Sequence, residues 1–172
     1  MTSIALSPFP LRTSTLARHD TPLGRLEIHV EGRIVTSLVL STDGALPHDG
    51  EDELVTPVHD SVRRQLDEYF AGRRKAFDVP VAHAGTAFQR GVWAQLMSVP
   101  WGATTTYGAV GQALGRPTAG RAVGGAVAAN PLPLIVPCHR VLAAGRRMTG
   151  YGQGDGLATK AWLLQHEGVP FS

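Results

Sequence analysis

The only cysteine of this 172-residue chain lies in the run Pro137-Cys138-His139-Arg140. A free cysteine often packs as a small apolar residue, and the apolar run 134–136 just before it is typical of a short buried strand. The two residues after it favour chemistry instead, because a histidine can accept the thiol proton and nearby positive charge stabilises a thiolate. The run therefore predicts a cysteine nucleophile.

The overall composition is that of a globular protein, with 43% hydrophobic and 17% charged residues. One cysteine excludes an internal disulfide framework and a multi-cysteine zinc site, and it fits a reducing compartment. No apolar run approaches the ~20 residues of a membrane span. The first twenty residues lack the features of a signal peptide, so we interpret them as a loose leader. We expect a cytoplasmic protein that does not bind membranes.

The charge is distributed unevenly along the chain. Residues 1–84 carry nine Lys and Arg against twelve Asp and Glu, whereas residues 85–172 carry seven against two. The second part is therefore net basic, as is common in proteins that bind nucleic acids, although solvated basic faces are common too.

The expected elements divide the chain near residues 83–85. Alternating residues on both sides of Glu31-Gly32 predict a hairpin over 24–40, and helical spacing predicts a helix that begins near Thr56 and ends before Gly72. The segment 76–81 reads as a short strand. Residues 42–55 are turn-rich and acidic, which is typical of a solvated loop.

The second part is expected to be mostly helical. One helix starts near Thr86 and stops before Pro100. Two shorter helices follow, one capped near Thr106 and one capped by Thr118 and running to Asn130, with a tight turn at 115–117 between them. This is the outline of a helix-turn-helix, although an ordinary helical hairpin has the same outline.

The second of these short helices is unusually rich in glycine, which costs helix stability by roughly 1 kcal/mol per residue relative to alanine. Gly120, Gly124 and Gly125 therefore indicate that something approaches the helix nearly to its backbone. A neighbouring helix would explain them, and so would a DNA groove with Arg121 reaching in.

Together, the strings "RAVGGAVAANPLPLIVPCHRVL" and "TGYGQGDGLATKAWLLQHEG" resemble the O6-alkylguanine-DNA alkyltransferase family, also called methylated-DNA–protein-cysteine methyltransferases. The resemblance covers about residues 86–168. It implies an α+β fold, with a small ribonuclease H-like α/β domain over 1–84 and a mostly helical, winged-helix-like domain over 85–172. It also implies repair in which an O6-alkylguanine, or an O4-alkylthymine, is flipped out of duplex DNA and its alkyl group passes to a cysteine.

The resemblance assigns residue roles. Cys138 would be the alkyl acceptor, His139 and Glu167 its activating partners, Tyr107 the contact to the flipped base, and Asn130 the brace of the turn before the cysteine. Arg121 would fill the vacated stack, with Thr118 and Gly124 as further DNA contacts. The base pocket would include Asn130, Tyr151, Lys160 and Val141, the last through its carbonyl. No cofactor or metal is implied, and each molecule would act once, as a monomer whose cooperativity on DNA is open.

The chain departs from the family pattern after Tyr151. The stretch 151–157 is two residues longer than usual, and Gly152 stands where a small side-chain donor often lies. The family zinc site built on several cysteines cannot form.

Two other functions remain open: a cysteine hydrolase, and a DNA-binding regulator without chemistry. Of the remaining aromatic residues, Trp93, Trp101 and Trp162 are expected in the core. Five histidines without ligand spacing are expected at the surface: His19, His29, His48, His59 and His83.

Overall fold

The computed structural model describes residues 13–172, and its N-terminal part is a three-stranded antiparallel sheet in the order β1-β2-β3. The strands span Ser14–Thr21, Gly24–Glu31 and Ile34–Leu40, so the predicted hairpin over 24–40 is confirmed. Strand β1 corrects the expectation of a loose leader up to residue 20. Its consecutive buried residues Thr15, Leu16 and Ala17 break the alternation that marks a half-buried strand, which is why the pattern hid it. Residues 1–12, also in the expected leader, lie outside the described residues.

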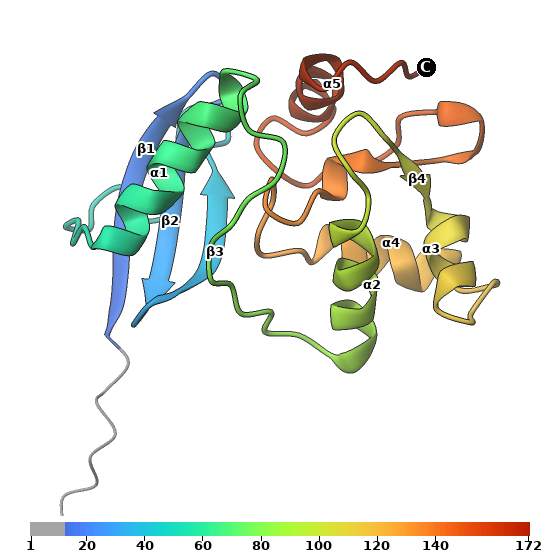
Figure 1. The fold of residues 1–172 in the computed structure, drawn as a ribbon, viewed down its shortest axis with the longest axis horizontal. Coiled ribbons are helices and arrows are strands. Elements are labelled where there is room, and N and C mark those ends of the chain that lie inside the picture. The colour runs from blue at the N-terminus through green and yellow to red at the C-terminus, as the bar shows by residue number, and fades with distance from the viewer. Residues whose placement is uncertain (1–12) are drawn as a thin grey trace, which may run out of the picture.

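Helix α1, Pro57–Phe70, packs across β1 and β2 (Figure 1). It has the predicted start at Thr56, with proline in its first turn. The strand expected over 76–81 is wrong, because only one bridge forms there, between Val35 and Val81. Pro80 has no N–H to donate, so a ladder cannot continue through it.

The C-terminal part is mostly helical, as predicted, and lies beside β3 in Figure 1. Its elements in chain order are α2 (Ala87–Met97), β4 (Thr105–Thr106), α3 (Tyr107–Ala113), α4 (Gly120–Ala128), the 3-10 turn η1 (Cys138–Arg140), β5 (Val141–Leu142), the 3-10 turn η2 (Ala144–Arg146) and α5 (Leu157–His166). Strands β4 and β5 form a short parallel pair.

Side-chain caps set the starts of two of the four C-terminal helices. The Thr86 hydroxyl accepts from the Gln89 N–H at the start of α2, and Thr106 caps α3 in the same way. The expected cap of α4 by Thr118 is wrong: the cap residue is Ala119, and no side chain caps the helix.

One hydrophobic core runs through both parts of the chain. It includes Leu66 of α1, Trp93 of α2 and Cys138, and strand β3 donates from the Leu38 N–H to the Pro131 carbonyl at 2.9 Å. Trp101 and Trp162 pack against this core, so all three tryptophans lie where expected. The two parts are therefore joined by packing as well as by the linker.

The histidines expected at the surface are more enclosed than predicted. His59 is fully buried, and the side chains of His19 and His29 are only 18% and 19% exposed. His48 and His83 are partly buried. Within residues 13–172, no helix is long and apolar enough to cross a membrane.

Candidate active site

The cysteine is presented by a bent loop between α4 and η1, not at the end of the strand expected over 134–136. Leu134 has a φ of 73°, and the Val136 N–H donates to the Leu132 carbonyl at 2.8 Å, which closes a turn. The Asn130 side chain spans this turn, donating to the Val136 carbonyl at 2.9 Å and accepting from the Leu132 N–H at 3.0 Å. Because a buried amide satisfies both ends of the turn, the loop has little freedom to move Cys138.

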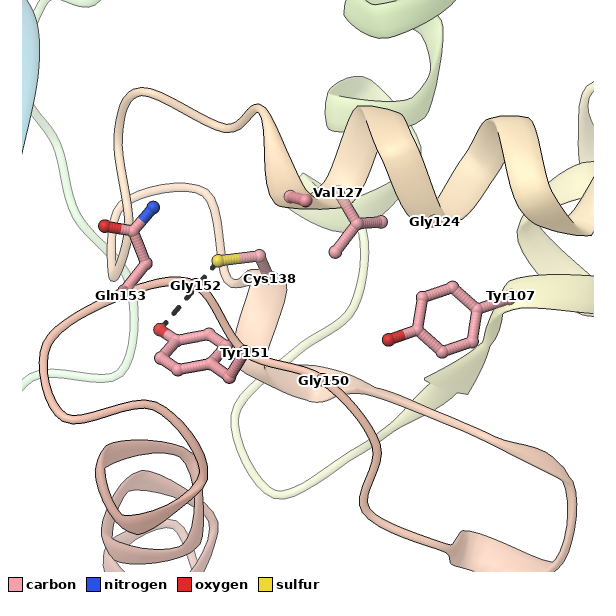
Figure 2. A pocket seen from close by; sticks show the side chains of 9 residues that line it. Tyr107, Gly124, Val127, Cys138, Gly150, Tyr151, Gly152 and Gln153 are labelled. Carbon is pink, nitrogen blue, oxygen red and sulfur yellow. Dashed lines mark hydrogen bonds between the residues drawn. The ribbon is translucent and has the colours of Figure 1, made fainter.

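Cys138 faces a cavity of about 340 Å³ between α4 and the loop 150–153 (Figure 2). Its thiol lies 3.9 Å from the Tyr151 hydroxyl. The Tyr107 hydroxyl points into the cavity from the opposite side, at the start of α3. The rest of the wall is made largely of small or apolar groups, and all the lining residues are Tyr107, Gly124, Val127, Ala128, Cys138, Gly150, Tyr151, Gly152 and Gln153. A flat ring could enter beside the thiol without meeting a charged side chain.

Behind the cysteine lies a buried network around the Glu167 carboxylate, which has no exposed surface. The ring Nε2 of His139 lies 2.7 Å from Glu167 Oε1, and Arg140 donates to both carboxylate oxygens, from Nε at 2.8 Å and from Nη2 at 2.9 Å. The hydroxyl of Tyr69, on α1, donates to Oε1 at 2.7 Å. Charge-assisted bonds of this kind are about twice as strong as neutral ones, so the carboxylate is held firmly.

The network fixes the protonation states around the thiol. Burial opposes ionisation of Glu167, but the hydrogen bonds and charges of His139 and Arg140 outweigh it and hold its pKa at about 2. Burial lowers the pKa of His139 despite the carboxylate beside it, and burial raises the pKa of the Cys138 thiol. At neutral pH the site therefore holds a protonated thiol, a neutral imidazole and an ionised carboxylate.

The free nitrogen of the imidazole is the group that could accept the thiol proton. His139 Nδ1 is buried and has no hydrogen-bond partner among the described residues, while its Nε2 is engaged by Glu167. A neutral imidazole with one unpartnered nitrogen is suited to general-base catalysis. Once protonated, it would be stabilised by the ionised carboxylate at its other nitrogen.

Three residues expected in the base pocket do not line the cavity: Asn130, Val141 and Lys160. Lys160 is 1% exposed, and its ammonium donates to the carbonyls of Val141 at 2.7 Å and Thr149 at 3.0 Å. The Val141 carbonyl, expected to bind the base, thus already accepts a hydrogen bond from Lys160. Burial lowers the pKa of Lys160 to about 8. The Lys160 ammonium therefore links strand β5 to the loop after residue 148.

The exposed surface of α4 is made mostly of small residues. Arg121 and Thr118 are exposed. Apart from the adjacent residues and the backbone of α4 itself, no described atom lies within 4 Å of the place that a Cβ on Gly120 or Gly125 would occupy. A neighbouring helix therefore does not explain these two glycines. Gly124 differs, because its Cβ would lie 4.0 Å from the Tyr107 ring at the cavity wall.

The long segment after Tyr151 is tied to the N-terminal part of the chain. The Thr42 hydroxyl donates to the Gly154 carbonyl at 3.1 Å, and Asp155 accepts from the Asp43 N–H at 3.0 Å. Gln153, within this segment, reaches the Asn130 carbonyl at 3.3 Å and lines the cavity.

Two residues of the network around Glu167 were not assigned to it from the sequence. Tyr69 was predicted only to lie in the helix that ends before Gly72, and its contact to Glu167 joins positions 98 residues apart. Arg140 was expected to support the thiolate, but it pairs with Glu167. No local pattern signals either contact, because both depend on how distant elements pack.

The family model for the 6-O-methylguanine DNA methyltransferase ribonuclease-like domain matches residues 13–83, and the one for the DNA binding domain matches residues 87–169. A methylated-DNA–protein-cysteine methyltransferase of Haemophilus influenzae is 38% identical over 89% of this chain and 86% of its own length. The chain belongs to this family. A constitutive member from Bacillus subtilis is 40% identical over 88% of this chain and 94% of its own.

Solved structures agree with the family. The Mycobacterium tuberculosis O6-methylguanine methyltransferase is 36% identical and superposes with a TM-score of 0.80 over 90% of this chain and 93% of that one. The same mycobacterial protein, crystallised in complex with DNA, is 37% identical over 89% of this chain and 92% of that one, again with a TM-score of 0.80. The expected fold, a small sheet domain followed by a helical domain, is confirmed.

Proposed function

We propose that this methyltransferase repairs DNA by moving the alkyl group of O6-alkylguanine, and of O4-alkylthymine, onto Cys138. The observation that carries the proposal is the position of the only thiol, in a cavity sized for a ring and backed by a neutral imidazole and an ionised carboxylate. Family membership supplies the reaction class.

The proposed transfer is a displacement at carbon. The sulfur forms a bond to the alkyl carbon as the bond from that carbon to guanine O6 breaks, and its proton passes to His139 Nδ1, directly or through one water. Glu167 stabilises the resulting imidazolium. The electron pair of the broken bond leaves with the guanine, and the Tyr107 hydroxyl, which points into the cavity, is placed to donate to that anion.

Access to a base inside duplex DNA requires flipping, because the reacting oxygen is otherwise stacked and paired. The exposed surface of α4 is suited to face DNA: it carries Arg121 and no bulky side chain at Gly120 or Gly125. In the proposal Arg121 enters the stack that the flipped base leaves, and Thr118 and Gly124 lie at the same surface. Double-stranded DNA is the macromolecular partner, and the protein acts as a cytoplasmic monomer.

The product on sulfur would be a thioether, which is stable to hydrolysis and to cellular reductants. The described chain offers no second thiol to receive the group. Each molecule is therefore expected to react once.

Titration of a fixed amount of protein with excess duplex DNA that carries O6-methylguanine tests the proposal. We expect a burst that approaches one methyl group per chain and then a flat line, with the added mass on the peptide containing Cys138. Cys138→Ala should bind the same DNA and transfer nothing. A regulator without chemistry would give no burst, and a hydrolase would show sustained turnover.

A further inference from the structure

A cluster of metal-binding side chains lies on the N-terminal sheet, apart from the alkyl-acceptor cavity. Glu27 and His29 are two residues apart on β2, so both side chains lie on the same face of the sheet, opposite Leu26 and Ile28. His48 reaches this face from the loop after β3. One ligand atom from each of the three residues falls within 4.8 Å of the others.

The distances within the cluster are close to those of a metal site. Oε2 of Glu27 lies 3.1 Å from His29 Nε2 and 2.9 Å from His48 Nδ1. Around a tetrahedral zinc ion with bonds of about 2.0–2.1 Å, neighbouring ligand atoms lie roughly 3.3 Å apart. A shift of a few tenths of an ångström in the imidazole rings would make room for the ion.

The charge of the cluster also favours a cation. The Glu27 side chain has no exposed surface, and its two carboxylate oxygens face the backbone N–H and the ring Nδ1 of His48. In the described part of the chain no lysine or arginine forms an ion pair with it. A buried carboxylate without a full compensating charge is costly, and a divalent cation would supply that charge.

The neighbouring arginines pair with groups other than Glu27 and hold the loop in place. Arg18 donates to the carbonyls of His48 and Glu51, and Arg25 pairs with Asp49 at 2.6 Å. The His48 backbone N–H itself donates to Glu27 Oε1 at 2.9 Å. The loop is thus pre-arranged with the His48 ring over the carboxylate, which reduces the ordering that metal binding would require.

We propose that Glu27, His29 and His48 form a zinc site that fastens the loop 41–55 to the sheet. Two imidazoles and one carboxylate suit zinc better than magnesium or calcium, which prefer oxygen alone. His48, with 39% of its side chain exposed, opens the site to solvent, which leaves a fourth position for water. The site is structural, since none of its residues lines the cavity that holds Cys138.

Zinc titration of the untagged full chain tests the site. The starting protein is Cys138→Ala, treated with a chelator, because the free thiol of Cys138 would otherwise compete with the histidines for zinc. We expect one zinc ion per chain by calorimetry, with a micromolar or tighter Kd. The melting temperature should rise by about 5–10 °C at a hundredfold excess over Kd.

Single variants locate the ion. His48→Gln and His29→Gln should each weaken zinc binding at least tenfold, with unchanged far-ultraviolet circular dichroism. His19→Gln is the matched control, because His19, on β1 of the same sheet, also pairs with a carboxylate, that of Asp67 on α1, but has no third ligand among the described residues. It should bind zinc as the starting protein does.

Cobalt(II) supplies a readout that does not depend on stability. Bound in place of zinc, it should give the visible absorption of a four-coordinate nitrogen and oxygen site, and His48→Gln should lose that absorption. The proposal is overturned if the starting protein takes up no zinc at a one-to-one ratio, or if His48→Gln binds it as tightly.

Discussion

The hydroxyl of Tyr69 offers a direct way to test whether the N-terminal part of the chain tunes the chemistry. Tyr69→Phe removes one of the four hydrogen bonds to Glu167 and leaves those from His139 and Arg140. A hydrogen bond to a charged group is worth about 1.5–3 kcal/mol. Because the carboxylate keeps three donors, we expect the low end, about 1.5 kcal/mol, or a fall in Tm of roughly 3–6 °C.

Tyr69→Phe should also change how the transfer rate depends on pH. With one donor fewer, the carboxylate concentrates its charge on His139 and favours the imidazolium, so the depressed pKa of His139 should rise. In the proposed transfer His139 must be neutral to accept the thiol proton, and the acid limb of the rate–pH profile should therefore move to higher pH. About half to one unit is expected, since one unit corresponds to about 1.4 kcal/mol.

The assay is single-turnover transfer from a methylated duplex, followed below the ordinary histidine pKa of about 6.5. Val62→Ala, in the same helix, is the matched control. Val62 is fully buried, and removing two carbons at about 0.8 kcal/mol each destabilises the protein to a similar extent without touching Glu167. If both variants show the same acid midpoint, Tyr69 acts only through stability and the electrostatic reasoning fails.

Four further outcomes are expected. His139→Ala and Glu167→Gln should each slow transfer strongly, and the double variant should be far less than additive; additive losses would mean that the two residues work separately. Arg121→Ala should impair repair of duplex DNA much more than reaction with free O6-benzylguanine, and equal losses would exclude a role in flipping. Gly125→Ala should raise the free energy of unfolding by up to about 1 kcal/mol yet weaken DNA binding in gel-shift titrations, because the added methyl meets no protein atom but stands on the proposed DNA surface. The wild-type chain should lose about 3 kcal/mol of stability as pH falls from about 4.5 to about 2. The depressed pKa of Glu167 stabilises the fold fully above the pKa of the unfolded carboxyl, and this stabilisation is lost as the pH falls to the folded pKa. Urea midpoints of Glu167→Gln should lack this loss.

The sequence predicted the elements whose signals are local. The Thr86 and Thr106 caps, the helix over 57–70 and the hairpin over 24–40 each depend on residues a few positions apart. The loop that presents Cys138 was interpreted as a strand because its residues are apolar, yet Asn130 and the positive φ of Leu134 bend it. Apolar composition reports burial and does not report backbone direction.

Contacts between distant segments could not be predicted in the same way. Lys160 was placed in the base pocket from its match to a family motif, whereas its ammonium lies behind the pocket on backbone carbonyls. His29 and His48 lie 19 positions apart with no ligand spacing, and only the packing of a loop on the sheet brings them to Glu27. Such juxtapositions follow from tertiary structure, which the local pattern does not encode.

The hydrophobic core that passes through both parts of the chain has a consequence for how the molecule opens. Leu66 and Cys138 belong to one cluster, so neither part can expose its interior while the other stays closed. The backbone amide of Cys138, which donates to the Val136 carbonyl at 2.8 Å, should then exchange its hydrogen with solvent at the slow rate of the amides in the middle of α1. Cys138 would belong to the most cooperative unit of the described residues, and its position would persist until that unit unfolds.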